Sequence, residues 1–437
     1  MEKMGEATAE YRPFLEYSKE ELAALLKSWG LPGYRVGQIR RWVFARKTDR
    51  FSEMSDLSKE LRTKLAEAFV APRQDGENDE TAKKAATLPI LLENGVEKTP
   101  SPAEVGETTG TAKTAETGGI AGAAEAAEAA KAGETAADGK SGSVAAAPVG
   151  FDSVFEGRLV AKSVSDDGSE KLLIEWRDGA RVECVLLRDD RGRRSACVSV
   201  QVGCAMKCAF CASGLGGFSR NLTKSEILEE LLRLNALLPK EERLTHIVVM
   251  GTGEPTLNLD ALLPALAEAT ASDGLDLGNR KVTISTVGIP AGIRRLAAEN
   301  VPYKLAVSLH APNDRIRDEI MPQNRIHPIA EVLSAADVFF KTTGRRVTFE
   351  YILLDGINAG LEHAAELARL LRNKTAIVNV IPYNPAPELP FKTPSTQTTR
   401  RFVDALEDAG IQVKIRFRKG DKINAACGQL RWSLRDR

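Results

Sequence analysis

Gly203-Cys204-Ala205-Met206-Lys207-Cys208-Ala209-Phe210-Cys211 places three thiols on one short stretch, with the spacing C-x3-C-x2-C. Three thiolates on one loop hold three corners of a cube-shaped iron–sulfur cluster and leave the fourth iron without a protein ligand. An iron that is open in this way binds a small molecule and passes an electron into it. The spacing therefore predicts a [4Fe-4S] cluster on Cys204, Cys208 and Cys211, and radical chemistry beside it.

A zinc site is the alternative for the same three cysteines. Structural zinc is usually bound by two closely spaced ligand pairs, and this chain has no second pair. Cys184 and Cys197 lie upstream, Cys427 lies far downstream, and the nearest histidine, His246, stands alone. The sequence favours the cluster and leaves zinc, or three unligated core thiols, open.

The chain after residue 190 alternates between short apolar runs and amphipathic segments. The expected strands are 196–202, 246–251, 281–286, 304–309, 347–353 and 376–381, with an edge strand at 413–417. The expected helices are 225–237, 259–271, 291–299, 329–341, 361–371 and 397–409. Six consecutive β–α units imply parallel strands with right-handed crossovers, and they are fewer than the eight of a closed barrel. The expected fold class is α/β, a partial (βα)6 barrel.

Composition divides the chain into four expected regions. Residues 1–71 carry apolar side chains at helical spacing after a capping box at Ser18, which predicts a helical accessory domain with a basic face. Residues 72–150 are rich in Ala, Glu, Thr, Gly and Lys and lack aromatic residues, so a low-complexity, disordered linker is expected. Residues 151–189 alternate between Asp-Gly turns as in an antiparallel β meander. Residues 190–437 form the expected core, which ends in a segment carrying Cys427.

The charge of the chain is unevenly distributed although its formal sum is +0. Residues 75–150 hold 13 acidic and 6 basic side chains, so the remainder is net basic. Basic residues cluster at 35–47, 188–194 and 414–422. Each cluster alone is ordinary solvated surface, but three of them on a basic body favour an RNA partner.

The ends of the chain and its hydropathy point to the reducing cytoplasm. The first residues are charged and lack the apolar core of a secretory signal. No stretch is apolar enough over the length that crossing a bilayer requires, so no membrane association is expected. Six cysteines in 437 residues do not indicate a disulfide scaffold, and an oxygen-sensitive cluster needs reducing surroundings.

Polar residues follow the expected strands at the ends where parallel α/β folds place their sites. Gly253 lets backbone approach a ligand closely, and Glu254 is suited to an ammonium group. Each polar strand end alone is more often a helix cap or a loop residue, but together they predict a ligand site around the cysteine loop. The remaining members of this set are Ser285, Ser308, Leu309, His310 and Asn384.

Two cysteines outside the loop have different surroundings. Cys427 lies among small residues in Ala425-Ala426-Cys427-Gly428, which indicates an accessible, reactive thiol. Cys197 lies inside the first expected strand, where a buried packing role is an equal alternative. Cys184 is expected to be a packing residue.

Taken together, these motifs resemble the radical-SAM adenine-C2 RNA methyltransferases, which act on 23S rRNA and some tRNAs. The resemblance covers nearly all of the chain outside 72–150 and includes an accessory RNA-binding domain near Leu31 to Ile39. It implies that Cys427 is the cysteine that becomes S-methylated, Cys197 the second catalytic cysteine and Glu183 the proton acceptor. It also implies the cluster ligands Cys204, Cys208 and Cys211, and the S-adenosylmethionine contacts Gly253, Glu254, Ser285, Ser308, Leu309, His310 and Asn384.

The resemblance implies a reaction that uses two S-adenosylmethionine molecules per turnover. The first methylates Cys427, and the second yields a 5′-deoxyadenosyl radical that takes hydrogen from that methyl group. The carbon radical on Cys427 adds to the electron-poor C2 of adenine, and a base removes the C2 proton. Cys197 then releases the product and forms a transient disulfide with Cys427. An electron donor such as flavodoxin and a monomeric state are expected.

Three other functions remain as alternatives. Methylation of adenine C8 in 23S rRNA, which confers antibiotic resistance, uses the same cysteines; the run Gly217-Phe218-Ser219-Arg220-Asn221-Leu222 favours C2. A zinc-stabilised RNA-binding module without catalysis leaves Cys197 and Cys427 unused. A radical enzyme for a small metabolite does not need the basic N-terminal region.

Overall fold

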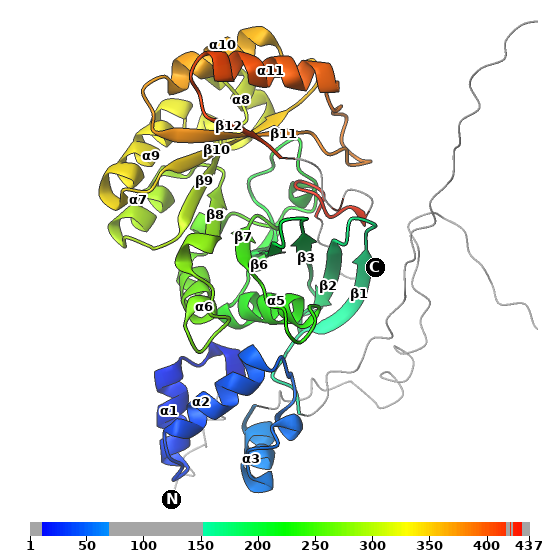
Figure 1. Ribbon diagram of the computed structural model, residues 1–437, viewed down its shortest axis with the longest axis vertical. Coiled ribbons are helices and arrows are strands. Elements are labelled where there is room, and N and C mark those ends of the chain that lie inside the picture. Colours follow the sequence, from blue (N-terminus) through cyan, green and yellow to red (C-terminus); the bar gives the residue numbers. More distant parts are fainter. Residues whose placement is uncertain (1–10, 70–151, 417–419, 421–422, 431–437) are drawn as a thin grey trace, which may run out of the picture.

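The protein is described by a computed structural model over residues 11–69, 152–416, 420 and 423–430. Figure 1 shows a group of helices at one end of the molecule and a curved sheet flanked by helices above it. The linker expected at 72–150 lies outside the described residues. Among the helices that are described, none has the length and apolar character that a bilayer-spanning segment needs.

One mixed sheet of ten strands dominates the described part of the chain. Its order is β1-β2-β3-β4-β7-β8-β9-β10-β11-β12. Strands β1 to β4 pair antiparallel, and from β4 to β12 every pairing is parallel. The expected α/β fold, with a meander leading into a partial parallel barrel, is confirmed. The meander is continuous with the barrel sheet, because β3 pairs with β4.

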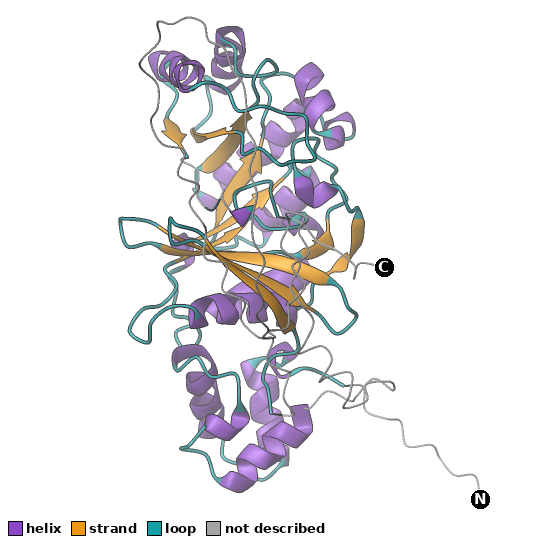
Figure 2. Cartoon of the chain, turned by 90° about the vertical axis from the view of Figure 1, so that its right-hand side faces the viewer, coloured by secondary structure: helices purple, strands orange, loops and turns teal. Residues whose placement is uncertain are grey.

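The strand bounds follow the apolar runs of the sequence closely. The main sheet comprises β1 (Arg158–Val164), β2 (Glu170–Glu175), β3 (Arg181–Arg188), β4 (Arg194–Cys197), β7 (His246–Val249), β8 (Val282–Thr286), β9 (Lys304–Ser308), β10 (Val347–Leu353), β11 (Ala376–Pro382) and β12 (Val413–Ile415). The helices lie outside the strands, as Figure 2 shows. They are α5 (Lys224–Ala236), α6 (Leu259–Thr270), α7 (Pro290–Ala298), α8 (Asp314–Ile320), α9 (Ile329–Thr343), α10 (Leu361–Leu371) and α11 (Thr396–Asp408).

The strand expected at 196–202 is wrong as a single element. β4 ends at Cys197, and β5 (Gln201–Gly203) pairs instead with β6 (Phe218–Asn221) in a separate two-stranded sheet. The interruption lies at Ser199, whose backbone N–H donates to the Glu230 carboxylate at 2.8 Å and so leaves the ladder. An apolar run does not reveal this change of partner. Its consequence is functional, since β5 delivers the chain into the cysteine loop.

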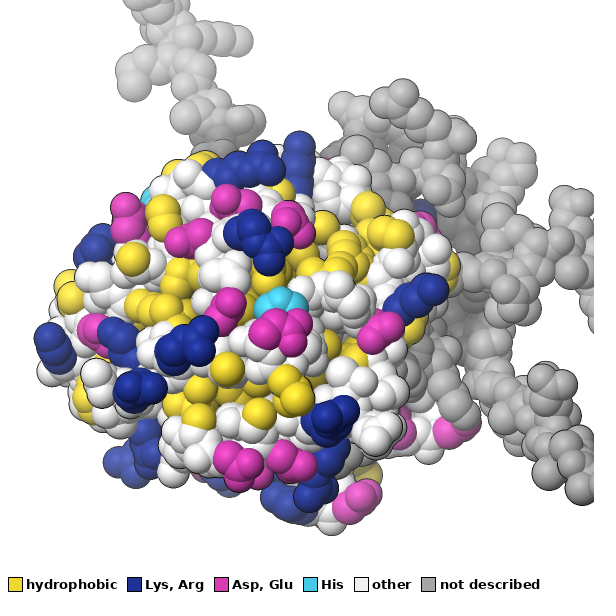
Figure 3. Space-filling view, turned by 90° about the horizontal axis from the view of Figure 1, so that it is seen from above, with side chains coloured by type: hydrophobic (Ala, Val, Ile, Leu, Met, Phe, Trp, Pro, Cys, Tyr) yellow, Lys and Arg dark blue, Asp and Glu magenta, His cyan; other side chains and the backbone are white. Residues whose placement is uncertain are grey.

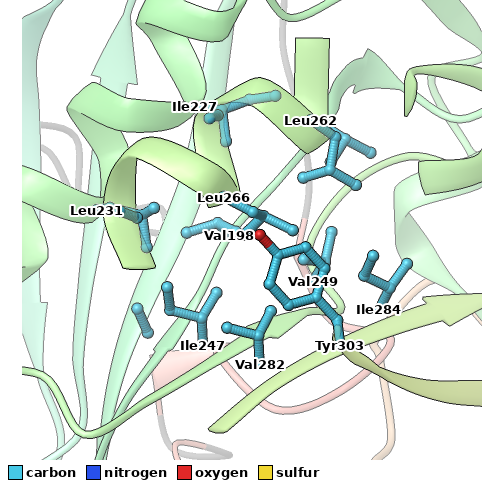
Figure 4. Close-up of a cluster of buried hydrophobic side chains, with 14 of the residues drawn as sticks. Val198, Ile227, Leu231, Ile247, Val249, Leu262, Leu266, Val282, Ile284 and Tyr303 are labelled. Atoms are coloured by element: carbon cyan, nitrogen blue, oxygen red, sulfur yellow. The ribbon is translucent and has the colours of Figure 1, made fainter. Parts of the chain in front are cut away.

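A packed apolar layer joins helices α5 and α6 to the sheet. Figure 4 shows side chains of α5 and α6 meeting those of the neighbouring strands. Fully burying one such aliphatic side chain contributes about 1.5–3 kcal/mol, so this layer holds the strand ends in place. Its labelled members are Val198, Ile227, Leu231, Ile247, Val249, Leu262, Leu266, Val282, Ile284 and Tyr303.

The N-terminal helices form the expected helical region. They are α1 (Lys19–Ser28), α2 (Tyr34–Arg40) and α3 (Lys59–Phe69), with a π-helical turn (Arg41–Ala45) after α2. The capping box at Ser18 is present, because its hydroxyl accepts from Glu21 N–H and the Glu21 carboxylate accepts from Ser18 N–H. Lys47 attaches this region to the body, since its ammonium donates to three carbonyls after α5, those of Leu238, Pro239 and Glu242.

Candidate active site

The three cysteines of the motif occupy one loop between β5 and β6 and line one cavity. Cys204 N–H donates to Gly217 O at 2.7 Å, which closes the base of the loop. Lys207 adopts a left-handed backbone with φ 52°, which turns the chain back between the first two thiols. Ala209 N–H donates to Ile320 O at 2.9 Å, so the end of α8 supports the loop from outside.

The chemistry of these thiols fits a bound iron cluster. Burial raises the pKa of Cys204 to about 11 and raises the pKa values of Cys208 and Cys211, and repulsion from neighbouring cysteines adds to the effect at Cys204 and Cys208. Such thiols stay protonated unless a metal cation takes the place of the proton. Among the described residues, no three His, Cys, Asp or Glu side chains converge as ligands of one ion. Cys204, Cys208 and Cys211 line one cavity, so all three are placed to hold such a cluster.

A buried guanidinium holds the strand ends behind the loop. Arg317 on α8 is 1% exposed and donates to carbonyls that follow β8 and end β9. Its Nη2 lies 2.7 Å from Val287 O and 3.1 Å from Ser308 O, and its Nε lies 3.1 Å from Leu309 O. Its charge also lowers the pKa of Cys208, against the larger effect of burial. Arg317 thus fixes the rim of the cavity that faces the cysteines.

Gly253 and Glu254 form a close-fitting part of the cavity wall. A Cβ on Gly253 would lie 2.6 Å from Gln201 Cβ, and its φ of 108° is strained for other residues. The Glu254 carboxylate, which is 2% exposed, is fully oriented by donors. It accepts from Thr256 N–H and Oγ1, from Thr286 Oγ1 and from Val287 N–H, at 2.6–3.0 Å. Burial nevertheless raises the pKa of Glu254.

Three of the expected polar strand ends line the cavity and two do not. Ser285, Ser308 and His310 face it. The His310 ring lies edge-on to Phe210, and burial lowers its pKa to about 3, so the imidazole is neutral. Leu309 is fully buried in the core instead.

Asn384 holds the C-terminal segment and lies outside the cavity lining. Its Nδ2 donates to Cys427 O at 3.3 Å, and its buried Oδ1 has no hydrogen-bond partner among the described residues. An unpaired buried acceptor of this kind is uncommon and indicates a missing partner.

Cys427 is exposed and faces the same cavity as the cluster loop. Although its side chain is accessible, the surrounding protein raises its pKa, and Arg416 opposes that shift. Hydrogen bonds clamp its segment against the cysteine loop and the chain after β11. They run from Ala212 N to Gly428 O at 2.8 Å, from Ser213 Oγ to Leu430 O at 2.7 Å and from Gln429 Nε2 to Pro385 O at 2.7 Å.

Cys197 packs against residues of the segment that carries Cys427. It is the last residue of β4, is 7% exposed and packs in one apolar cluster with Val185, Ala425 and Leu430. Burial raises its pKa strongly, and proximity to Cys427 adds to the shift. No disulfide is present, since all six cysteines of the described residues are free thiols. The expectation of a disulfide is therefore not supported for this state of the protein.

Glu183 lies next to this pair of cysteines but does not line the cavity. It is on β3, on the same face as Val185, which pairs with Cys197. Lys171 Nζ lies 2.7 Å from Glu183 Oε1 and donates to Asn424 O at 3.3 Å. Lys171 therefore links Glu183 to the segment that carries Cys427.

Sequence reasoning missed two charged residues of the cavity, Glu350 and Arg416. A signal for Glu350 existed, since it is the only charged residue of the apolar strand Val347–Leu353. A lone carboxylate in a buried strand is costly unless it has a task. Arg416 offered no comparable signal, because it lies in a run of basic residues.

The expected basic clusters serve partly internal roles. Arg40 and Lys47 bind groups of the body, and Arg188 and Arg194 form ion pairs with Glu170 and Glu242. The face shown in Figure 3 carries basic and acidic side chains interspersed with apolar ones. Exposed Arg41 and Arg46 remain on the N-terminal helices.

Comparison with known proteins gives consistent relatives for the whole chain. Residues 198–371 match the Radical SAM superfamily, and residues 13–71 match the ribosomal RNA large subunit methyltransferase N-terminal domain. A probable dual-specificity RNA methyltransferase RlmN of Rhodopirellula baltica is 43% identical over 95% of this chain and 90% of its own length. A protein of the same name from Carboxydothermus hydrogenoformans is 35% identical over 96% of this chain and 98% of its own length.

A solved structure shares the architecture over nearly the full length. The crystal structure of a radical SAM methyltransferase from Sphaerobacter thermophilus superposes with a TM-score of 0.73 at 33% identity. The match covers 96% of this chain and 98% of that one.

Proposed function

The chain belongs to the RlmN family of radical SAM RNA methyltransferases, and we propose that it methylates C2 of adenine in 23S rRNA and in tRNA. The observation that carries the proposal is the clamping of the Cys427 segment onto the triple-cysteine loop within one cavity. A zinc-binding module or a simple RNA-binding protein has no use for a separate accessible thiol held beside three others.

The residues of the cavity bind and orient the reactants. When bound, the [4Fe-4S] cluster and S-adenosylmethionine supply the one-electron cleavage that creates a carbon radical. Cys204, Cys208 and Cys211 hold the cluster. The glycine-lined wall at Gly253 allows close backbone approach, and the neighbouring strand ends contact the cofactor. The proposed contacts are Gly253, Glu254, Ser285, Ser308, Leu309, His310 and Asn384, of which Asn384 has an unpaired oxygen and Leu309 offers only its backbone.

Cys427 is the proposed carrier of the methyl group. C2 of adenine lies between two ring nitrogens and is too electron-poor to attack a sulfonium methyl directly. A carbon radical on the sulfur of Cys427 adds to it instead. The exposed position of Cys427 at the cavity lets this sulfur reach both the cofactor and the RNA base.

Glu183 and Cys197 complete the reaction in this proposal. The adduct radical loses the C2 proton to Glu183 and its unpaired electron to the redox centre that supplied one, which leaves a closed-shell thioether between Cys427 and C2. The thiolate of Cys197 then attacks the sulfur of Cys427. The bond between that sulfur and the product carbon breaks, the carbon takes a proton to become a methyl group, and a disulfide remains. Packing of Cys197 against Ala425 and Leu430 supports this role, since only a short movement is needed.

The proposed RNA partner follows from the surface of the N-terminal helices. The N-terminal helices present cation–aromatic pairs, with Arg46 over Trp42 at 4.0 Å and Lys64 over Trp29 at 4.9 Å, and exposed Tyr34. Such groups bind phosphates and stack on bases. We propose a monomer that receives electrons from a small carrier such as flavodoxin.

The test is anaerobic turnover with 23S rRNA and tRNA, followed by mass spectrometry of the digested RNA. The expected product is 2-methyladenosine from both RNAs with the wild-type protein and none with Cys427→Ala. Cys184→Ala is the matched control, because Cys184 is fully buried in the core and outside the cavity.

Two results would contradict the proposed function. Formation of 8-methyladenosine would assign the sister activity, and full methylation by Cys427→Ala would remove the carrier. Protein that contains stoichiometric zinc but no iron or sulfide after anaerobic purification would favour the binding module.

A further inference from the structure

Glu350 is a buried carboxylate in the cavity that the roles above leave without a task. It lies on β10, is 4% exposed and lines the cavity with Cys427. Its Oε1 accepts from Asn379 Nδ2 at 2.9 Å and lies 3.8 Å from Arg416 Nη2. Its Oε2 is fully buried and has no hydrogen-bond partner among the described residues. Native proteins leave few such atoms unpaired, so Oε2 indicates a hydrogen-bond donor that binds there.

The neighbour of Glu350 on the next strand is a hydroxyl. Glu350 pairs in register with Ser308 across the parallel strands β10 and β9, and both side chains line the cavity. Adjacent strands lie about 4.8 Å apart, so the carboxylate and the hydroxyl form a polar pair along the wall. A carboxylate beside a second polar group suits the two adjacent hydroxyls of a ribose, as acidic residues do in dinucleotide-binding folds.

The position of Glu350 and Ser308 in the cavity indicates that they contact the ribose of the cofactor rather than another part of it. The three cluster cysteines line the cavity, and so does Cys427. The 5′ carbon of a nucleoside sulfonium has to lie between the open iron and the carrier sulfur for hydrogen to pass to it from the methyl group on the carrier. Its ribose is then next to Cys427, and Glu350 lies close enough to Cys427 to raise its pKa.

We propose that Glu350 is a cofactor-binding residue whose Oε2 accepts a hydrogen bond from a ribose hydroxyl of S-adenosylmethionine, beside Ser308. The inference rests on the proposed function, because it takes S-adenosylmethionine as the occupant of the cavity. Asn379 is a positioning residue: it stands opposite Glu350 in the β10–β11 register and fixes Oε1, which directs Oε2 into the cavity.

The experiment measures binding of S-adenosylhomocysteine by calorimetry to protein loaded anaerobically with its cluster. Glu350→Gln keeps the shape of the side chain and replaces a carboxylate acceptor by an amide. Since a hydrogen bond to a charged group is lost, affinity is expected to fall by about tenfold to a hundredfold. Glu230→Gln is the matched control, because Glu230 is equally buried and also has an unpaired oxygen but does not line the cavity.

Analogues of the ligand that lack one ribose hydroxyl identify the bonded atom. Wild-type protein is expected to bind the 2′-deoxy or the 3′-deoxy compound about as weakly as Glu350→Gln binds the parent. The variant is expected to lose little further affinity with that same analogue. Asn379→Ala keeps the Glu350 carboxylate but removes the hydrogen bond that orients it, so it is expected to weaken binding less than Glu350→Gln does. This variant replaces Glu350→Gln in the experiment if Glu350→Gln fails to retain iron.

Two outcomes would overturn the inference alone. Equal affinity of Glu350→Gln and wild-type protein for S-adenosylhomocysteine would show that Oε2 does not contact the cofactor. Unchanged cofactor affinity with weakened binding of the RNA substrate would assign Oε2 to the target nucleotide instead. Absence of any S-adenosylhomocysteine binding by the wild-type protein is a different failure, because it would overturn the proposed function as well.

Discussion

At the scale of single residues, the two cysteines with proposed roles outside the cluster loop, Cys197 and Cys427, occupy opposite environments. Cys427 is exposed, whereas Cys197 is buried at the end of β4 beneath the same C-terminal segment. Burial raises the pKa of Cys197 strongly, so its thiol is protonated and unreactive near neutral pH. In the proposed reaction, a resolving thiol that is inert until the segment above it moves is protected from early reaction with the methylated Cys427.

The first prediction concerns Cys197→Ala. Without the second thiol the product stays bound to Cys427, so a covalent protein–RNA adduct is expected to accumulate to about one per protein. Denaturing gel electrophoresis of anaerobic reactions with labelled RNA measures it, and ribonuclease treatment should remove the label. Cys184→Ala should turn over without an adduct. A gel that shows only free, methylated RNA with Cys197→Ala would contradict the assigned role.

At the scale of elements, buried carboxylates join helix α5 to the chain that leads into β1. Glu229 is 1% exposed and accepts from the backbone N–H groups of Glu156 and Gly157 that lead into β1. Glu156 accepts from Ser225 Oγ at 3.1 Å near the start of the same helix. Burial, and next the charge of Glu229, raises the pKa of Glu156 to about 7. This contact between helix and strand therefore depends on a proton.

The second prediction is that this contact weakens as the pH rises. Glu156 has a pKa of about 7 in the folded protein and 4.5 as its reference value, so the folded state holds the proton more tightly. Its contribution to stability is full below pH 4.5 and is lost between pH 4.5 and 7, in all about 3 kcal/mol.

Glu156→Gln removes this pH dependence. The free energy of unfolding of the variant, relative to that of wild-type protein, should therefore be higher at pH 8 than at pH 5. Urea unfolding at both pH values measures the difference. The charged and titratable groups around Glu156 are not substituted, so they are the same in both proteins. They are Glu226, Glu229, Arg177 and Tyr11. The exposed Glu319→Gln is the control. An equal effect of Glu156→Gln at both pH values would refute the assignment.

At the scale of the whole molecule, one buried guanidinium connects the accessory helices to the catalytic body. Arg40 ends α2, and its side chain is 6% exposed. Its Nη1 lies 2.6 Å from Glu268 Oε2, and its Nε lies 3.1 Å from Asp273 Oδ2, at and just after the end of α6. In the proposed function these helices bind RNA, and they can place one nucleotide in the cavity only if they are held rigidly to the barrel. Arg40 provides that connection together with Lys47.

The third prediction follows from this connection. Arg40→Ala leaves two carboxylates without their main partner, so a loss of roughly 3 kcal/mol is expected, as for other broken buried ion pairs. Hydrogen exchange in α1 to α3 should rise, and RNA methylation should fall more than cleavage of S-adenosylmethionine. Arg41→Ala is the neighbouring control, because Arg41 is exposed. Unchanged exchange in the N-terminal helices of Arg40→Ala would contradict the role.

Much of this molecule was readable from local patterns, because those patterns reflect local physics. The spacing of Cys204, Cys208 and Cys211 is a property of one loop, the capping box at Ser18 belongs to one helical turn, and period-2 and period-3.6 apolar runs identify strands and helices. The resemblance added roles for Cys427 and Cys197, which lie 230 positions apart in the chain. The division of the run 196–202 into β4 and β5 was not readable, since it depends on a contact between Ser199 and Glu230.

The sequence by itself determined the cluster loop, the alternation of the main strands and helices after residue 190, and the set of candidate thiols. Only the tertiary structure decided which side chains share the cavity. It removed Leu309 to the core, placed Glu183 beside Lys171 and brought Glu350 and Arg416 into the cavity wall. The physical reason is that burial and hydrogen-bond satisfaction are properties of packed neighbours far apart in the chain. Glu350 Oε2, for example, can be recognised as unpaired only when the positions of all neighbouring hydrogen-bond donors are known.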